Sequence, residues 1–219
     1  MVYRLLKGSL QVAILCIIKA DTNQGEVQML PSVNLKTVSV DDLFQVKDWL
    51  QDPEINQMWY GCDDNGQPFH AGYDLTFDAS ERMELVNRLA SDRNRDVISV
   101  FDELDEHIGE GQLAYEWPLL EAQLFLLIGK KELWHHHFGT AALVKLLDYA
   151  FLEKELHRVW VDVPEYNTNA LHMVDHVGFV VEGHFRGAHR KDNTWYDSSV
   201  LGLLSDEYAR RRSRIMETV

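Results

Sequence analysis

The sequence predicts an α/β chain in which strands and helices build one sheet-based domain, and three observations in residues 124–204 predict this class. An unbroken apolar run covers residues 124–128, as in a buried strand. Apolar residues then recur at helical spacing over residues 141–151. Valines alternate with other side chains over residues 159–163, so one face of a strand is apolar.

The amino-terminal third predicts strands, one helix and a long loop. We expect strands at residues 9–19 and about 26–38, joined by a polar turn. Ser39 is placed to cap a helix that Pro53 ends. Residues 52–76 are then expected to form one long irregular loop, a kind of segment that often carries function.

The rest of the chain continues the alternation. A second helix is expected from Asp78 or Ser80, and a short helix from Asn167 to Gly178, which suits a helix end. Strands are expected at residues 97–101, 108–117, 122–128 and 157–163, with a hairpin made of residues 179–186 and 195–204.

The loop before the central helix is the most informative segment, because a strand there runs directly into the amino end of a helix. That helix opens at Gly139. The first N–H groups of a helix have no partner within it, so they attract an anion such as phosphate.

Charge and cysteine content narrow the class of protein. The chain has 219 residues, with 21 basic and 35 acidic side chains and a net charge of −14. Such a balance argues against nucleic acid as a partner. Residues 41–84 hold eleven acidic and two basic side chains. This stretch is either a solubilising surface or a field that attracts a cationic substrate.

Two cysteines make neither a disulfide framework nor a metal quartet, and they fit a reducing cytoplasm. The apolar run Leu10–Ile18 lacks a cleavage site and is too short to span a bilayer, so we expect a buried strand and no membrane association.

Five segments then follow one another in a characteristic order. They are Leu35–Asn56, Trp134–Phe151, His157–Trp160, Asn167–Phe179, and Trp195–Asp197 leading into Leu201–Leu203. Together they resemble the GNAT superfamily of N-acetyltransferases, and most closely its ribosomal-protein alanine/serine N-acetyltransferase branch. The resemblance covers about residues 33–208. It leaves residues 1–32 as an extra strand or hairpin and residues 209–219 as a basic tail.

The resemblance implies a mixed central sheet that splays open, flanked by about four helices, with acetyl-CoA as co-substrate in the gap. The strand segment Leu126, Leu127 and Ile128 would contact the pantetheine arm, and Asn167 would touch the cofactor nearby. The loop would surround the pyrophosphate with the residues Trp134, His135, His136, His137, Phe138, Gly139 and Thr140.

The chain departs from the family pattern at three places. Trp134 and His137 stand where relatives carry Gln or Arg and Gly, so three histidines either donate to the phosphates or block them. Val174 stands where many relatives carry a tyrosine that acts as the general acid. His172 or His176 could supply that proton instead. Gln123 replaces a frequent glutamate base.

Candidate catalytic and substrate residues follow from the implied gap. Glu121, Glu116 and Asp197 are the candidate bases, and a backbone N–H near Leu127 would hold the oxyanion. The loop residues Trp59, Tyr60, Asp63 and Asp64 would line a pocket for an amine; alternatively, the two aromatic residues only pin the loop to the core.

We do not expect a functional metal, although His135–His137 place ring nitrogens close together, because no third ligand accompanies them. The leading hypothesis is an N-acetyltransferase that works by direct amine attack in a ternary complex. The acceptor would be a small cationic amine or a protein amino terminus. The alternative is a non-catalytic GNAT-fold binding protein, and the amino-terminal hairpin leaves a homodimer open.

Overall fold

The structure is a computed structural model and describes residues 29–63, 65–76 and 81–217. The strand expected at residues 9–19 and most of the predicted amino-terminal hairpin lie outside the described residues. The same holds for the helix starts proposed at Asp78 and Ser80.

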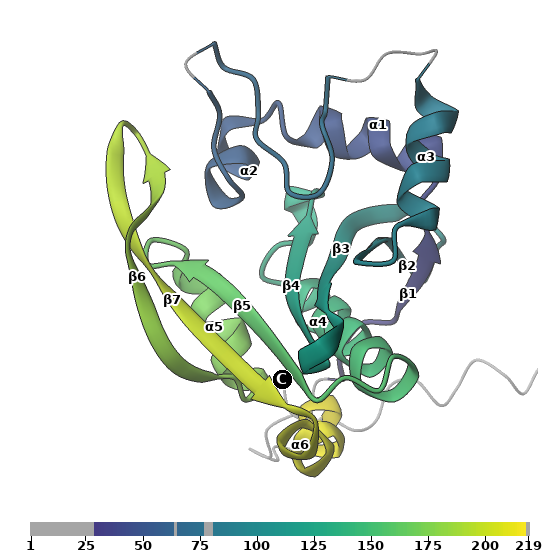
Figure 1. The fold of residues 1–219 in the computed structure, drawn as a ribbon, viewed down its shortest axis with the longest axis vertical. Helices are drawn as coiled ribbons and strands as arrows, with labels where there is room; N and C mark the ends of the chain where they lie inside the picture. The colour runs from purple at the N-terminus through teal and green to yellow at the C-terminus, as the bar shows by residue number, and fades with distance from the viewer. Residues whose placement is uncertain (1–28, 64, 77–80, 218–219) are drawn as a thin grey trace, which may run out of the picture.

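One seven-stranded sheet organises the molecule, in the order β1-β2-β3-β4-β5-β7-β6 (Figure 1). Strand β4 pairs with β5 in parallel, and every other neighbouring pair is antiparallel. The predicted mixed sheet is confirmed. The strands are β1 (Val33–Thr37), β2 (Arg95–Asp102), β3 (His107–Glu116), β4 (Glu121–Ile128), β5 (Arg158–Pro164), β6 (Val180–Lys191) and β7 (Thr194–Leu204).

The sheet splays between β4 and β5. Their pairing joins only Glu121–Gln123 to Arg158–Trp160. Beyond Gln123 the two strands diverge, and Figure 1 shows β5, β7 and β6 turning away from β1–β4 as the second arm of a V. The remaining half of β4 therefore faces the gap along one edge.

Six α-helices surround this sheet in the described part of the chain, two more than expected. They are α1 (Val40–Trp49), α2 (Pro53–Met58), α3 (Arg82–Ser91), α4 (Phe138–Asp148), α5 (Thr168–Val177) and α6 (Ser205–Glu217). Helices α1 and α3 pack together near β2 and β3, whereas α4 contacts β1, β4 and α5. A π-helical turn, Tyr149–Glu153, extends α4.

Local signals explain where α1, α2 and α5 begin and end. Ser39 and Asp42 form a capping box at the start of α1, as expected from the sequence. Pro53 does more than end α1: it is the first residue of α2, with Asp52 as cap. The prediction of one loop over residues 52–76 was therefore wrong for residues 53–58. Gly178 ends α5 with φ of 110°, a conformation that favours glycine.

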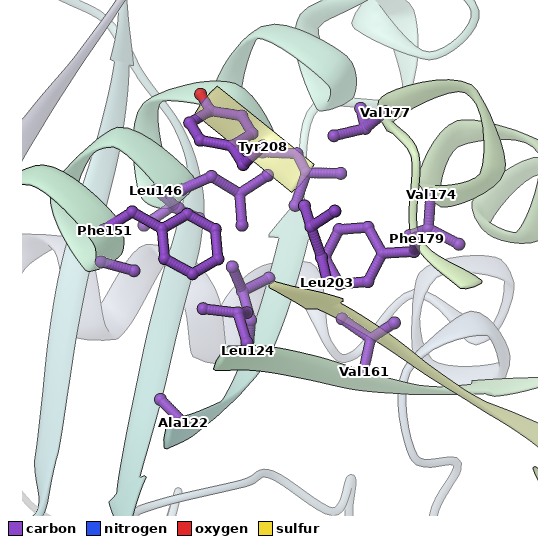
Figure 2. Packing of buried hydrophobic residues seen from close by; sticks show 14 of the residues in the cluster. Ala122, Leu124, Leu146, Phe151, Val161, Val174, Val177, Phe179, Leu203 and Tyr208 are labelled. Atoms are coloured by element: carbon purple, nitrogen blue, oxygen red, sulfur yellow. The ribbon is translucent and has the colours of Figure 1, made fainter. Parts of the chain in front are cut away.

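The largest apolar cluster joins the two arms below the gap. Figure 2 shows Leu124 of β4 and Val161 of β5 meeting Leu146 of α4, Val174 of α5 and Phe179. Because both arms contribute to one core, their relative position is fixed by packing rather than by strand pairing.

Helix α6 closes this core from below. The Tyr208 hydroxyl donates to Asp148 Oδ1 at 2.8 Å, and Arg212 pairs with the same carboxylate at 2.6 Å. The basic segment expected as a tail thus lies mostly in a helix attached to α4.

Candidate functional site

The amino end of α4 presents unpaired backbone donors. Its N-cap residue is His137, and no side chain caps the helix. The first intrahelical bond runs from the Ala141 N–H to the His137 carbonyl. The amides of Phe138, Gly139 and Thr140 therefore point out of the helix end, where a phosphate is the natural partner.

A cavity of about 550 Å³ extends from this helix end along β4. Its lining is mainly apolar, with four histidines and no lysine, arginine or carboxylate among its residues. The predicted cofactor residues that line it are Leu126, Leu127, Ile128, Trp134, His135, His137, Gly139, Thr140 and Asn167. The other lining residues are Ile55, Met58, Trp59, Leu133, Asn169, Ala170, His172, Met173 and His176.

Two of the eleven expected cofactor residues do not line this cavity. His136 is exposed, and Phe138 packs its ring against the apolar cluster around Ile108. The histidine loop therefore borders the cavity without filling it.

Trp134 takes a structural part in this loop. Its indole Nε1 donates to the Ile128 carbonyl at 2.9 Å. This bond fastens the loop to the free edge of β4.

The register of β4 decides which amides face the gap. The Gly129 N–H bonds to the Ile108 carbonyl on β3. Because donors alternate along an antiparallel strand, Leu127 also directs its N–H to β3. Leu126 and Ile128 direct theirs into the gap, and they are the gap-facing amides next to Leu127, near which the oxyanion donor was expected.

A smaller cavity of about 90 Å³ lies where β4 and β5 separate. It shares six lining residues with the larger cavity, namely Met58, Trp59, Leu126, Asn167, Ala170 and Met173. Tyr60, Phe125, Asp162 and His189 also line it. The two cavities therefore adjoin at the splay.

Aromatic rings form one wall of the smaller cavity. Trp59 meets Tyr60 edge to face at 5.4 Å between ring centroids, and Tyr60 lies 6.4 Å from Phe125. Burial and the nearby negative charge of Asp162 raise the pKa of Tyr60 to about 12. The structure thus brings the aromatic pair to the splay.

Of the two loop aspartates, the structure describes Asp63. The Asp63 carboxylate accepts from the backbone N–H groups of Asn65 and Gln67, which lowers its pKa. It closes its own turn and lines neither cavity. Asp64 lies outside the described residues.

None of the three expected bases lines either cavity. Glu121 pairs with Arg158 at 2.5 Å in the closed part of the sheet, and Glu116 ends β3 beside it. Asp197 is exposed and accepts from the Gly187 N–H at 2.8 Å. Glu121 and Glu116 miss the gap because the strands part only after Gln123, whereas the Asp197 carboxylate is bound instead to the backbone of β6.

The carboxylate that does reach the gap is Asp162 on β5. Its Oδ2 lies 3.0 Å from Nε2 of His189 on β6. The sequence could have indicated this residue, because Asp162 lies between two valines of the strand and so on the face opposite the core.

A buried carboxylate on β3, that of Glu110, supports the loop behind Trp59. It accepts from the Tyr73 hydroxyl and from Gln112 Nε2, each at 2.7 Å, and lies 3.1 Å from His70 Nε2. The His70 ring lies 5.7 Å from that of Trp59. This network holds residues 70–73 against the sheet.

Within residues 29–63, 65–76 and 81–217, no cluster of three or more histidine, cysteine, aspartate or glutamate side chains is arranged to hold a metal ion. In the same residues, no helix has the length and apolar character needed to cross a membrane.

An open helix amino terminus, a splayed sheet and a groove along the free strand edge define an acyl-CoA-dependent acyltransferase. A family model described as acetyltransferase (GNAT) domain matches residues 32–180. The chain belongs to the GNAT acetyltransferase family, and it is an N-acetyltransferase with acetyl-CoA as its co-substrate.

Similar proteins carry related names. The chain is 25% identical to the uncharacterized N-acetyltransferase p20 of Bacillus licheniformis over 179 residues, 81% of this chain and 95% of that protein. It is 28% identical over 74 residues to spermidine N(1)-acetyltransferase of Vibrio cholerae, 34% of this chain and 43% of that protein.

Solved structures show the same fold. The spermidine N-acetyltransferase of Vibrio cholerae in complex with CoA and spermine superposes with a TM-score of 0.68 at 21% identity. The alignment covers 81% of this chain and 98% of that one.

Proposed function

We propose that this enzyme acetylates a primary amine of a small, cationic polyamine. The observation that carries the proposal is the pair of adjoining cavities. They run from the uncapped amino end of α4 to the point where β4 and β5 separate. The narrow volume at the splay suits an amine group, and the net charge of −14 favours a cationic acceptor. The polyamine names of the similar proteins agree with this class.

Backbone groups supply the cofactor contacts in this proposal. The amides of Phe138, Gly139 and Thr140 bind the pyrophosphate, with His135 and His137 beside them. Leu126 and Ile128 offer their N–H groups to the pantetheine arm, in the manner of an added strand.

Acetyl transfer then proceeds by direct attack. The amine nitrogen attacks the thioester carbonyl, while the Leu126 N–H stabilises the oxyanion. Val174 is buried and supplies no proton. A thiolate is a good leaving group, so it departs without a strong acid.

We also propose a cytoplasmic location for this enzyme. Cys62 is an exposed free thiol, which suits the reducing cytoplasm. A protein amino terminus as acceptor and a homodimer stay as predictions.

Release of free thiol from acetyl-CoA tests the function with spermidine, spermine, a diamine and a peptide with a free amino terminus. We expect turnover with the polyamines and at most one tenth of it with the peptide. Turnover with the peptide and with none of the polyamines would show that the acceptor is a protein amino terminus instead. Acetyl-CoA binding without turnover of any amine would favour the non-catalytic alternative.

A further inference from the structure

We infer that Asp162 is the proton acceptor and anchor for the acceptor's ammonium group, held in place by His189; this inference rests on the proposed amine acetylation. Asp162 stands two residues beyond Trp160, the last residue of β5 paired with β4. Its side chain is 15% exposed and lines the small cavity, so it lies where the acetyl group must meet the amine.

One oxygen of this carboxylate is unsatisfied. Within the described part of the chain, Asp162 Oδ1 is buried and has no hydrogen-bond partner. An unpaired charged oxygen is costly to bury, so its presence points to a ligand that brings donors. A primary ammonium group carries three N–H donors and the opposite charge.

The surrounding side chains fit a cation as well. Trp59, Tyr60 and Phe125 line the same cavity, and aromatic faces attract an ammonium ion. Tyr60, with its raised pKa, stays neutral and does not compete with Asp162 for the cation's proton.

His189 acts as a positioning residue. It is 9% exposed, comes from β6 and packs its ring 6.0 Å from Tyr60. Its bond to Oδ2 leaves Oδ1 as the carboxylate oxygen without a partner among the described residues. The titratable side chains that line this cavity are those of Tyr60, Asp162 and His189.

Acetyl transfer requires two proton transfers, one before and one after the attack. The bound ammonium gives one proton to Asp162 Oδ1, and the neutral nitrogen attacks the thioester carbon. The C–N bond forms and the C–S bond breaks. The second nitrogen proton passes to the thiolate, giving free CoA thiol, while Asp162 releases its proton to water.

The test compares Asp162→Asn with Asp175→Asn, an exposed aspartate on α5 that lines neither cavity. We expect Asp162→Asn to lower kcat/KM for spermidine at least about 100-fold at pH 7.5. Its affinity for acetyl-CoA should change less than twofold, and raising the pH should restore activity in part as free amine accumulates. His189→Gln should lower kcat/KM about tenfold and alter the pH profile, again with acetyl-CoA affinity unchanged.

Activity of Asp162→Asn within threefold of the Asp175→Asn control would overturn the inference, while wild-type turnover would leave the proposed function standing. A second measurement needs no variant. Calorimetry on the wild-type CoA complex should show a primary alkylammonium ligand binding at least tenfold tighter than the neutral alcohol of the same chain length. Equal binding of the two would also overturn the inference.

Discussion

His137 adopts φ of 63° at the N-cap of α4, the left-handed conformation that glycine tolerates best. The family resemblance predicted glycine at this position, and the backbone of His137 has the conformation that glycine would supply. We predict that His137→Gly leaves stability nearly unchanged, because relief of strain offsets the greater freedom of glycine when unfolded.

His137→Val should instead destabilise the fold by about 1–2 kcal/mol, because a β-branched side chain is poorly tolerated in this region. Urea unfolding of the two variants and the wild type measures the difference. Equal stability of both variants would show that position 137 is not held in the left-handed conformation.

The histidines around the larger cavity predict ring donors for the phosphates of acetyl-CoA. His135, His137, His172 and His176 line this cavity. Removing two of these rings in His135→Ala/His172→Ala should weaken acetyl-CoA binding by at least about threefold, because two hydrogen-bond donors are lost. Calorimetry of the double variant beside the wild type measures the change, and equal affinity of the two proteins would contradict this role.

At the scale of elements, local signals predicted much of the fold. The capping box at Ser39 and the left-handed Gly178 are short-range features, so sequence alone located α1 and α5. Helix α2 was missed because Pro53 can both end one helix and begin the next. Glu116 and Glu121 failed as candidate bases for a long-range reason: only the strand registers show that both lie before the point where the gap opens.

Helix α6 predicts a measurable tertiary contribution. The Tyr208 hydroxyl bonds to the Val144 carbonyl and Asp148 Oδ1 at a buried position. Tyr208→Phe should cost about 1–2 kcal/mol, because the Val144 and Asp148 acceptors lose this donor. That loss corresponds to roughly 2–8 °C in Tm for a chain of this size. Thermal unfolding of Tyr208→Phe beside Arg210→Gln, an exposed control on α6, measures it; a loss no larger than the control's would contradict the docking of α6.

At the scale of the whole molecule, the net charge of −14 should attract a cationic acceptor over several ångströms. Salt shortens that range from about 10 Å at 0.1 M to about 3 Å at 1 M. We therefore predict that KM for spermidine rises with added sodium chloride while kcat changes little. Initial rates measured from low to high salt check this. A KM that does not change with salt would show that long-range attraction does not help the acceptor to bind.

The splayed arms, the uncapped start of α4 and the free edge of β4 act together only if one ligand spans them. Calorimetric titration of acetyl-CoA into the wild type and into Ala170→Trp, which places a bulky ring where the two cavities adjoin, tests this most directly. We predict one binding site per chain in the wild type and at least tenfold weaker binding in a folded Ala170→Trp protein. Absence of binding to the wild type, or equal affinity in the variant, would contradict the assignment of these cavities to the cofactor.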